Sequence, residues 1–172
     1  MKTFIKYSRL FREDSKRYGL KKSLLFFDPR LIAIFYFRLS QYFNEIRLVY
    51  FSALIYNKLR TKYGLDIHPQ VIIGGGLKIV HLGGIVIHRK AIIGNNLTIL
   101  NNVTIGQKNR KDSIKVPILG DNIFLSVFST LIGDIKVGDN VVIGAHCLVR
   151  KDVETNKKVY VKQNINYSEI IS

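Results

Sequence analysis

A histidine and an aspartate fifteen residues apart are the side chains whose types and spacing best suit catalysis. His81 is the third residue of Ile79-Val-His-Leu-Gly-Gly84, where the glycines indicate a corner of the chain. In a fold whose turns take about eighteen residues, Asp66 and His81 come close on adjacent turns. The carboxylate then fixes the imidazole tautomer and leaves the other ring nitrogen free as a general base. The alternative is that the two are unrelated surface residues.

The chain has four histidines, and the other three suit catalysis less well. His68 lies in a turn, Ile67-His-Pro69, and His146 falls at a corner of the repeat described below. Catalytic zinc needs three clustered ligands. Since His81 and His88 fall on different sides of a turn and His146 lies several turns away, we expect no metal site.

A strict period of six residues predicts the scaffold that holds these side chains. Apolar residues recur at this spacing in two arrays separated by a short break. The first array is Ile67, Ile73, Ile79, Ile85, Ala91, Leu97 and Val103, and the second is Leu119, Leu125, Leu131, Val137, Ile143 and Val149. A helix repeats at 3.6 residues and a strand at 2, so this period indicates a hexapeptide β-helix with three short sides to each turn.

The helix signals lie before the repeat. Asp28-Pro29 is a typical helix start, and Gly64 is a typical helix end. We therefore expect one helix from residue 29 to about 43 and another over about 47–63, forming a hairpin. The sequence divides into an N-terminal helical region at 1–64, a β-helix at 65–154 with a loop at 107–118, and a C-terminal tail at 155–172.

Composition limits the classes of function. The net charge of +15 permits nucleic-acid binding. The basic residues concentrate in four separate segments, 2–22, 47–62, 108–115 and 157–162, and form no recognisable nucleic-acid module, so no nucleic-acid partner is expected. The single cysteine, Cys147, fits a reducing compartment such as the cytoplasm. The longest apolar run, 31–37, is far short of a membrane span. The wide aromatic and basic surface of the helices favours packing, with peripheral membrane contact as the alternative.

The motifs together resemble the serine acetyltransferase branch of the hexapeptide acyltransferases. The resemblance covers about residues 30–154 and rests on segments that follow one another almost without gaps. These are Leu65-Asp-Ile-His-Pro69, Ile73-Gly-Gly-Gly76, Val80-His-Leu-Gly-Gly-Ile-Val86, Leu97-Thr-Ile-Leu-Asn-Asn-Val-Thr-Ile-Gly106, a basic loop ending in Pro117, and Ile132-Gly-Asp-Ile-Lys-Val-Gly-Asp139. The resemblance implies an all-β, left-handed parallel β-helix, a homotrimer, and acetyl-CoA bound between subunits. It places the general base at His81 and its orienting carboxylate at Asp66.

The resemblance also implies the residues that contact acetyl-CoA and the acceptor. The pantetheine arm is expected along Gly106, Ser126, Gly144 and Ala145. Lys108, Arg110 and Lys111 are candidates for the phosphates, with solvated loop cations as the alternative. Acceptor contacts fall on Val80, Gly83, Lys115 and Val116. Either backbone amides near the Gly83-Gly84 corner or donors across the subunit interface can face the oxyanion.

Departures from the family pattern shift the expected acceptor. The family has an aspartate where this chain has Val80, and an Arg-His pair where it has Lys115 and Val116. Loss of polar partners weakens binding of a small zwitterion. The departures favour the short acetyltransferases of capsule and exopolysaccharide synthesis, which modify a sugar hydroxyl on a glycan or lipid-linked oligosaccharide. The alternatives are serine O-acetylation and a non-catalytic β-solenoid.

Overall fold

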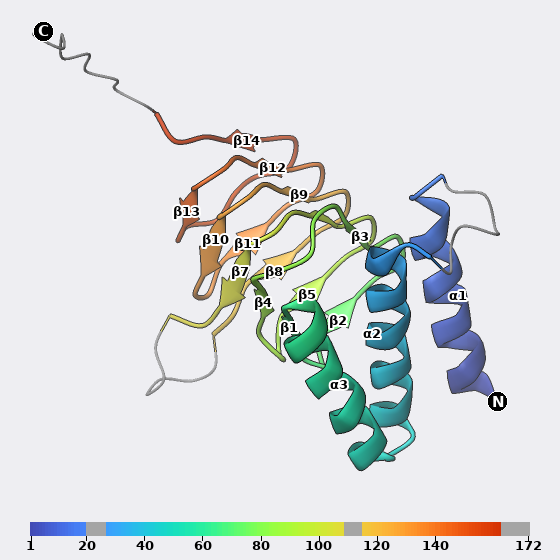
Figure 1. Cartoon of the computed structure of the whole chain (residues 1–172). Coiled ribbons are helices and arrows are strands. Elements are labelled where there is room, and N and C mark those ends of the chain that lie inside the picture. Colours follow the sequence, from blue (N-terminus) through green and yellow to red (C-terminus); the bar gives the residue numbers. More distant parts are fainter. Residues whose placement is uncertain (20–26, 109–114, 163–172) are drawn as a thin grey trace, which may run out of the picture.

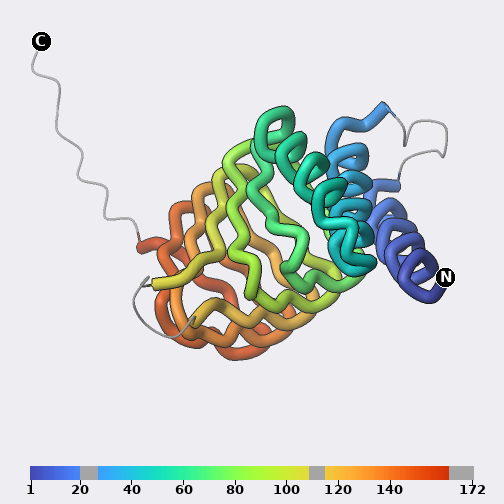
Figure 2. The backbone as a smooth tube through the Cα atoms, turned by 90° about the horizontal axis from the view of Figure 1, so that it is seen from below, coloured from blue at the N-terminus to red at the C-terminus, as the bar shows by residue number. Residues whose placement is uncertain are grey.

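Three helices cover one end of a parallel β-solenoid (Figure 1). The computed structural model describes residues 1–19, 27–108 and 115–162. The helices are α1 Lys2–Lys16, α2 Pro29–Glu45 and α3 Val49–Tyr63. The expected hairpin of α2 and α3 is present, and α1 packs beside α2 as a third helix. Figure 2 shows the helical layer at the N-terminal end of the solenoid, away from the last strands.

The helix boundaries follow from capping. The Asp28 side chain accepts a hydrogen bond of 2.8 Å from the backbone N–H of Arg30, with Pro29 at the first helical position. Helix α3 ends at Gly64, which has a left-handed backbone at φ 64°. That glycine turns the chain directly into the first strand of the solenoid.

The strands stack into three parallel sheets in the described residues, one for each side of the prism. Sheet A contains β1 Leu65–Ile67, β4 Ile85–Ile87, β7 Thr104–Gly106, β10 Thr130–Ile132 and β13 Leu148–Val149. Sheet B contains β2 Ile72–Ile73, β5 Ile92–Ile93, β8 Ile118–Leu119 and β11 Lys136–Val137. Sheet C contains β3 Lys78–Ile79, β6 Thr98–Ile99, β9 Phe124–Leu125, β12 Val142–Ile143 and β14 Lys158–Val159. The final strand, β14, lies in the segment assigned to the tail from sequence.

Apolar side chains fill the axis of the prism, as the six-residue period predicts. Every residue of both sequence arrays is buried, with an exposed fraction of 5% or less. At one corner a ladder of left-handed asparagines bonds side chain to side chain along the stack. It consists of Asn96, Asn122, Asn140 and Asn156.

A buried ion pair joins the helical layer to the prism. The Arg38 guanidinium donates to both carboxylate oxygens of Asp14, at 2.8 and 3.1 Å, and both side chains are almost wholly buried. Arg38 also donates to the carbonyl oxygens of Ile73 and Gly74, and Asp14 accepts from the N–H of Leu77. Helices α1 and α2 are therefore fastened to the first turn of the solenoid.

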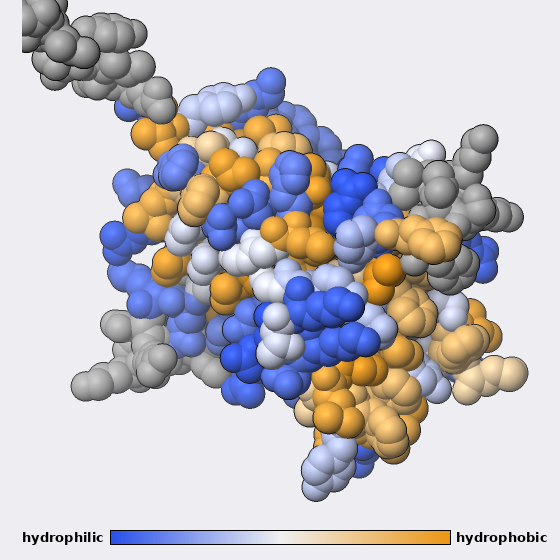
Figure 3. Space-filling model, viewed as in Figure 1, coloured by the Kyte–Doolittle hydropathy of each residue, from blue (hydrophilic) through white to orange (hydrophobic). Residues whose placement is uncertain are grey.

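The apolar residues of the helical layer divide into two groups. Some are fully buried in the core shared with the prism, including Ala33, Ile34, Phe37 and Leu59. Others remain exposed in this chain around the α2–α3 junction, including Leu48, Tyr50, Phe51 and Leu54. In Figure 3 apolar surface gathers over the lower part of the helical layer. None of the helices in the described ranges has the length and apolarity needed to cross a membrane.

Candidate functional site

His81 projects from a corner that is longer than its counterpart on the next turn. Ile67 pairs with Ile87, twenty residues later, whereas Ile87 pairs with Ile105, eighteen residues later. The two additional residues fall between β3 and β4, in the corner 80–84, and the His81 side chain is exposed there. The extension carries this imidazole away from the packed surface of the prism.

The helical layer fixes both ends of this corner. The Tyr18 hydroxyl donates to the carbonyl oxygen of Ile79 and accepts from the N–H of the same residue, both at 2.9 Å. The Arg30 guanidinium donates to the Val80 carbonyl oxygen at 3.4 Å. Gly83 lies against Gly64 at the end of α3. Anchors on both sides of His81 limit the motion of its backbone.

Asp66 lies on β1 with its half-exposed carboxylate facing α3. The Tyr56 hydroxyl donates a hydrogen bond to Oδ1, and the Arg60 Nε lies 3.9 Å from Oδ2. Burial, followed by the hydrogen bond to the carboxylate, raises the pKa of Tyr56 to about 12. An open groove of about 380 Å³ begins at this carboxylate. It is lined by Asn57, Arg60, Thr61, Gly64, Asp66, Gly84, Ile85 and Val86.

The structure does not bring Asp66 and His81 into hydrogen-bonding contact. Among the residues it describes, no hydrogen bond or ion pair joins them. The parallel register places Asp66 beside Val86, because the first turn has twenty residues rather than the eighteen assumed from sequence. Both side chains nevertheless flank one junction, where the end of α3 meets the corner 80–84. Their action as a pair stays a prediction.

One edge of the prism carries several of the predicted acceptor and cofactor residues. Backbone hydrogen bonds run from turn to turn along the row Val80, Leu100, Ser126, Gly144 and Tyr160. We call this row, with the residues that follow each member at the corner, the His81 edge. Gly83 and Ala145 belong to it as well. The His81 edge is continuous from the first turn of the solenoid to the last.

A bulky side chain on the His81 edge packs along the stack. Phe128 has a left-handed backbone at φ 57° and is 50% exposed. Its ring stacks on His146 of the next turn, with centroids 4.9 Å apart and planes within 8°. These two stacked rings lie near the expected path of the pantetheine arm.

The other predicted residues lie at the far edge of sheet A, where the 107–118 loop leaves the prism. Gly106 ends β7, and the side chain of Lys108 packs near Gly133. Lys115 forms an exposed ion pair with Asp134 at 3.1 Å. Val116 is 9% exposed, so its side chain packs inward. Arg110 and Lys111 lie outside the described residues. We call this row the loop edge.

Sequence reasoning missed the residues that hold the site in place. Tyr18, Arg30, Tyr56 and Arg60 all come from the helical layer, and all four contact the first turn of the solenoid or its corner. The spacing of Tyr56 and Arg60 by four residues places them on one helix face. That spacing could have shown a shared face, but it does not show what the face contacts.

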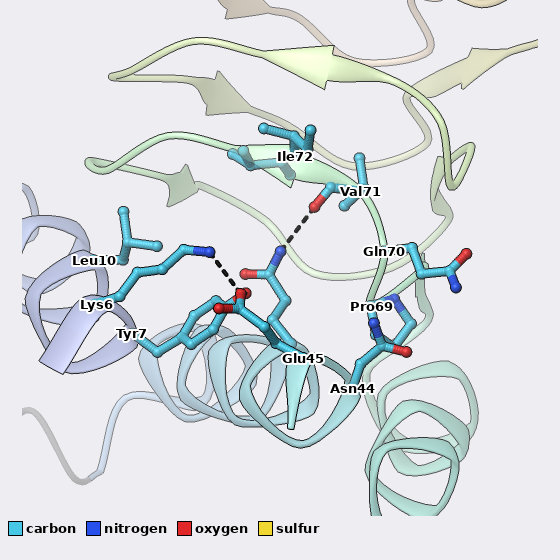
Figure 4. A pocket seen from close by; sticks show the side chains of 11 residues that line it. Lys6, Tyr7, Leu10, Asn44, Glu45, Pro69, Gln70, Val71 and Ile72 are labelled. Carbon is cyan, nitrogen blue, oxygen red and sulfur yellow. Dashed lines mark hydrogen bonds and ion pairs between the residues drawn. The ribbon is translucent and has the colours of Figure 1, made fainter. Parts of the chain in front are cut away.

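A separate hollow of about 280 Å³ lies between α1, α2 and the turn before β2 (Figure 4). Glu45 accepts from Lys6 at 2.6 Å and from Tyr7 at 2.7 Å, and Gln41 donates to the Val71 carbonyl at 2.8 Å. None of the predicted site residues lines it. The described part of the chain contains no group of three or more His, Cys, Asp and Glu side chains placed to hold a metal ion.

Similarity to known proteins shows which family this chain belongs to. A serine acetyltransferase of Helicobacter pylori is 31% identical over 147 residues, which cover 86% of this chain and 85% of that protein. This chain belongs to the serine acetyltransferase family. A serine acetyltransferase of Synechococcus elongatus is 30% identical over 84% of this chain and 59% of its own length. No protein-family model matches the chain.

Solved structures of this family share the fold. Serine acetyltransferase 1 of Entamoeba histolytica, solved with L-cysteine, has a TM-score of 0.80 and 27% identity over 90% of this chain and 63% of its own. The Neisseria gonorrhoeae enzyme gives 0.81 and 26%, over 91% and 63%. The likeness confirms the predicted left-handed parallel β-helix with N-terminal helices. The chain spans only 29–45% of several curated relatives that it matches.

The prediction of a glycan O-acetyltransferase was wrong. The relatives and structural neighbours are serine acetyltransferases rather than capsule enzymes, and they give no support to a glycan or lipid-linked acceptor or to membrane contact. The error came from reading the loss of polar partners at Val80 and Val116 as evidence for a sugar acceptor. Within one chain Val116 is buried at the loop edge, whereas Val80 lies on the His81 edge. The two substitutions by themselves do not identify the acceptor.

Proposed function

We propose that this chain is a serine O-acetyltransferase that transfers the acetyl group of acetyl-CoA to the hydroxyl of L-serine. The observation that carries the proposal is the match to the Helicobacter pylori serine acetyltransferase over most of both chains. An exposed histidine on an extended corner, next to a groove that holds a carboxylate, supplies the groups that the reaction needs.

His81 acts as the general base in this proposal. Its imidazole takes the proton from the serine Oγ while that oxygen attacks the thioester carbonyl carbon. The tetrahedral intermediate then collapses, the carbon–sulfur bond breaks, and the leaving CoA thiolate takes the proton back from the imidazolium. The base ends the cycle unchanged, and the products are O-acetylserine and CoA.

Asp66 stabilises the charged imidazolium, and the corner glycines assist the oxyanion. A carboxylate near a developing imidazolium lowers the free energy of the charged state. The backbone N–H groups of Gly83 and Gly84 belong to the same corner as His81. Because these glycines lack side chains, a substrate oxygen can approach their amides closely.

The residues predicted to contact acetyl-CoA lie on both edges of sheet A, and this arrangement supports a site between chains. Ser126, Gly144 and Ala145 lie on the His81 edge, whereas Gly106 and Lys108 lie on the loop edge. A homotrimer in which the His81 edge of one prism faces the loop edge of the next would bring both sets to one acetyl-CoA. In this arrangement Lys108 would contact the phosphates of the acetyl-CoA.

The experiment is a steady-state assay of CoA release from acetyl-CoA by the purified chain. We expect turnover with L-serine, identification of O-acetylserine by mass spectrometry, and little turnover with L-alanine, which lacks the hydroxyl. D-Serine tests whether the α-carbon substituents are bound specifically. Turnover of sugars or nucleotide sugars with no turnover of L-serine at saturating concentration would overturn the proposal.

A further inference from the structure

Two side chains on one face of α3 contact the Asp66 carboxylate. Tyr56 donates its hydroxyl hydrogen to Oδ1, and Arg60, one helical turn later, lies 3.9 Å from Oδ2. The Arg60 guanidinium also lies over the Tyr56 ring, 5.6 Å from its centroid. The edge-to-face contact between Tyr56 and His68, with centroids 5.3 Å apart, holds the ring from the other side.

Packing of helix α3 fixes the position of Tyr56 relative to the Asp66 carboxylate. Leu59 and Tyr63 are buried in the core between the helix and the prism. Gly64 ends the helix against the corner 80–84 and leads directly into β1. Tyr56 and Asp66 are therefore joined by one helical segment and one tight turn, and the hydroxyl has little freedom to leave the carboxylate.

We propose that Tyr56 is a positioning residue for acetyl transfer, and that its hydroxyl, assisted by Arg60, holds the Asp66 carboxylate oriented for His81. A carboxylate has about four lone-pair sites, so the contacts from α3 leave acceptor capacity for an imidazole N–H. The inference rests on the proposed role of Asp66 in the function above. It makes the helical layer part of the catalytic apparatus as well as a structural cover.

The groups that face Asp66 determine what the loss of the Tyr56 hydroxyl does to its carboxylate. The titratable and charged groups that face it are Tyr56 and Arg60 from α3 and His68 at the end of β1, while β4 presents Val86. The raised pKa of Tyr56 keeps its phenol neutral and donating throughout the physiological range. Removing that donor takes away the hydrogen bond that fixes Oδ1, so the carboxylate loses its orientation.

The first measurement does not depend on turnover. Carboxyl-carbon NMR at pH 7 gives the chemical shift of the Asp66 side chain in the full chain, in Tyr56→Phe and in Tyr50→Phe. Tyr50 is the matched control because it lies on the same helix and is 84% exposed. We expect Tyr56→Phe to shift this resonance, because the carboxylate loses its hydrogen bond from the phenol, and Tyr50→Phe to leave it unchanged. An unchanged value in Tyr56→Phe overturns the proposal.

The second measurement separates positioning from a general structural effect. Tyr56→Phe should lower kcat with L-serine by roughly 10- to 100-fold and leave the KM for acetyl-CoA unchanged. In an Asp66→Asn background the same substitution should have little further effect. An equal loss in both backgrounds overturns the proposal. If the wild-type chain does not acetylate serine, the proposed function fails, and the carboxyl-carbon NMR comparison still decides whether Tyr56 holds Asp66.

Discussion

Gly64 and Gly83 lie so close together that a methyl group on Gly64 would fall 2.9 Å from the Cα atom of Gly83. The first residue ends α3 and the second belongs to the corner that carries His81. This contact is where the element that holds Asp66 and the element that holds His81 meet. The relative position of the two predicted catalytic side chains therefore depends on two residues without side chains.

We predict that Gly64→Ala destabilises the fold and lowers acetyl transfer. A left-handed alanine costs about 1–2 kcal/mol, and the clash with backbone atoms adds to that cost. Thermal unfolding followed by circular dichroism measures the loss. Gly19→Ala is the matched control, since Gly19 has φ 61° but nothing within 4 Å of the added methyl. Equal losses in the two variants would show that the contact with Gly83 has no influence.

The His81→Ala variant should lose activity without losing its fold. Removal of a general base lowers kcat by about 10²–10⁴-fold, while binding of CoA measured by calorimetry should persist. His88→Ala is the control because His88 lies on another corner and its ring accepts a hydrogen bond only from the nearby Lys90 N–H. Retention of full activity by His81→Ala would refute the assignment of the base.

The docking of α1 should weaken in acid through Glu45. Hydrogen bonds from Lys6 and Tyr7 lower the pKa of Glu45 from its ordinary value of 4.5. A depressed carboxyl pKa contributes stability that is present above pH 4.5 and is lost as the pH falls through the lower, folded-state value. Comparing wild type with Glu45→Gln by urea unfolding should show an advantage for wild type at pH 7 that shrinks below pH 4. A pH-independent difference would contradict the prediction.

Asn122 should be a sensitive position in the asparagine ladder. Its side chain accepts from Asn96 and donates to Asn140, both at 3.0 Å, and its backbone is left-handed at φ 58°. Alanine there removes two hydrogen bonds and adds backbone strain, so we expect a loss of about 2–3 kcal/mol in the free energy of unfolding. Asn101→Ala is the comparison, because the Asn101 side chain bonds to no other described residue. A loss no larger than that of Asn101→Ala would disprove the role of the ladder.

The sequence predicts the prism well because one physical requirement recurs in every turn. Each side must place an apolar residue on the axis, and a period of six records that demand directly. The sequence pattern does not reveal that the first turn has two extra residues, and the reason is related. Apolar residues occupy the inward position and also the position two residues earlier, as with Leu65 and Ile67. A two-residue extension therefore leaves the hexad count unbroken, and the array from Ile67 to Val103 changes position between Ile79 and Ile85 without a visible gap.

Spacing along the solenoid was sufficient to predict the positions of some candidate residues, whose roles stay predictions. His81 lies exposed at a corner, as expected, and Ser126 and Gly144 follow on the same edge. The contacts of Tyr56 and Tyr18 could not be predicted, because they depend on how the helices pack across the first turn. Nothing in the local pattern of a helix specifies which distant strand its polar face will meet.

The extended corner shows that the architecture of the solenoid and the placement of the imidazole depend on different residues. The eighteen-residue turns can propagate by strand pairing alone, and a version of the first turn shortened by two residues would still fill the axis. Such a molecule would keep its architecture and lose the protrusion that carries the imidazole. Insertions at a corner thus allow a repetitive scaffold to gain or lose a chemical group without rebuilding its interior.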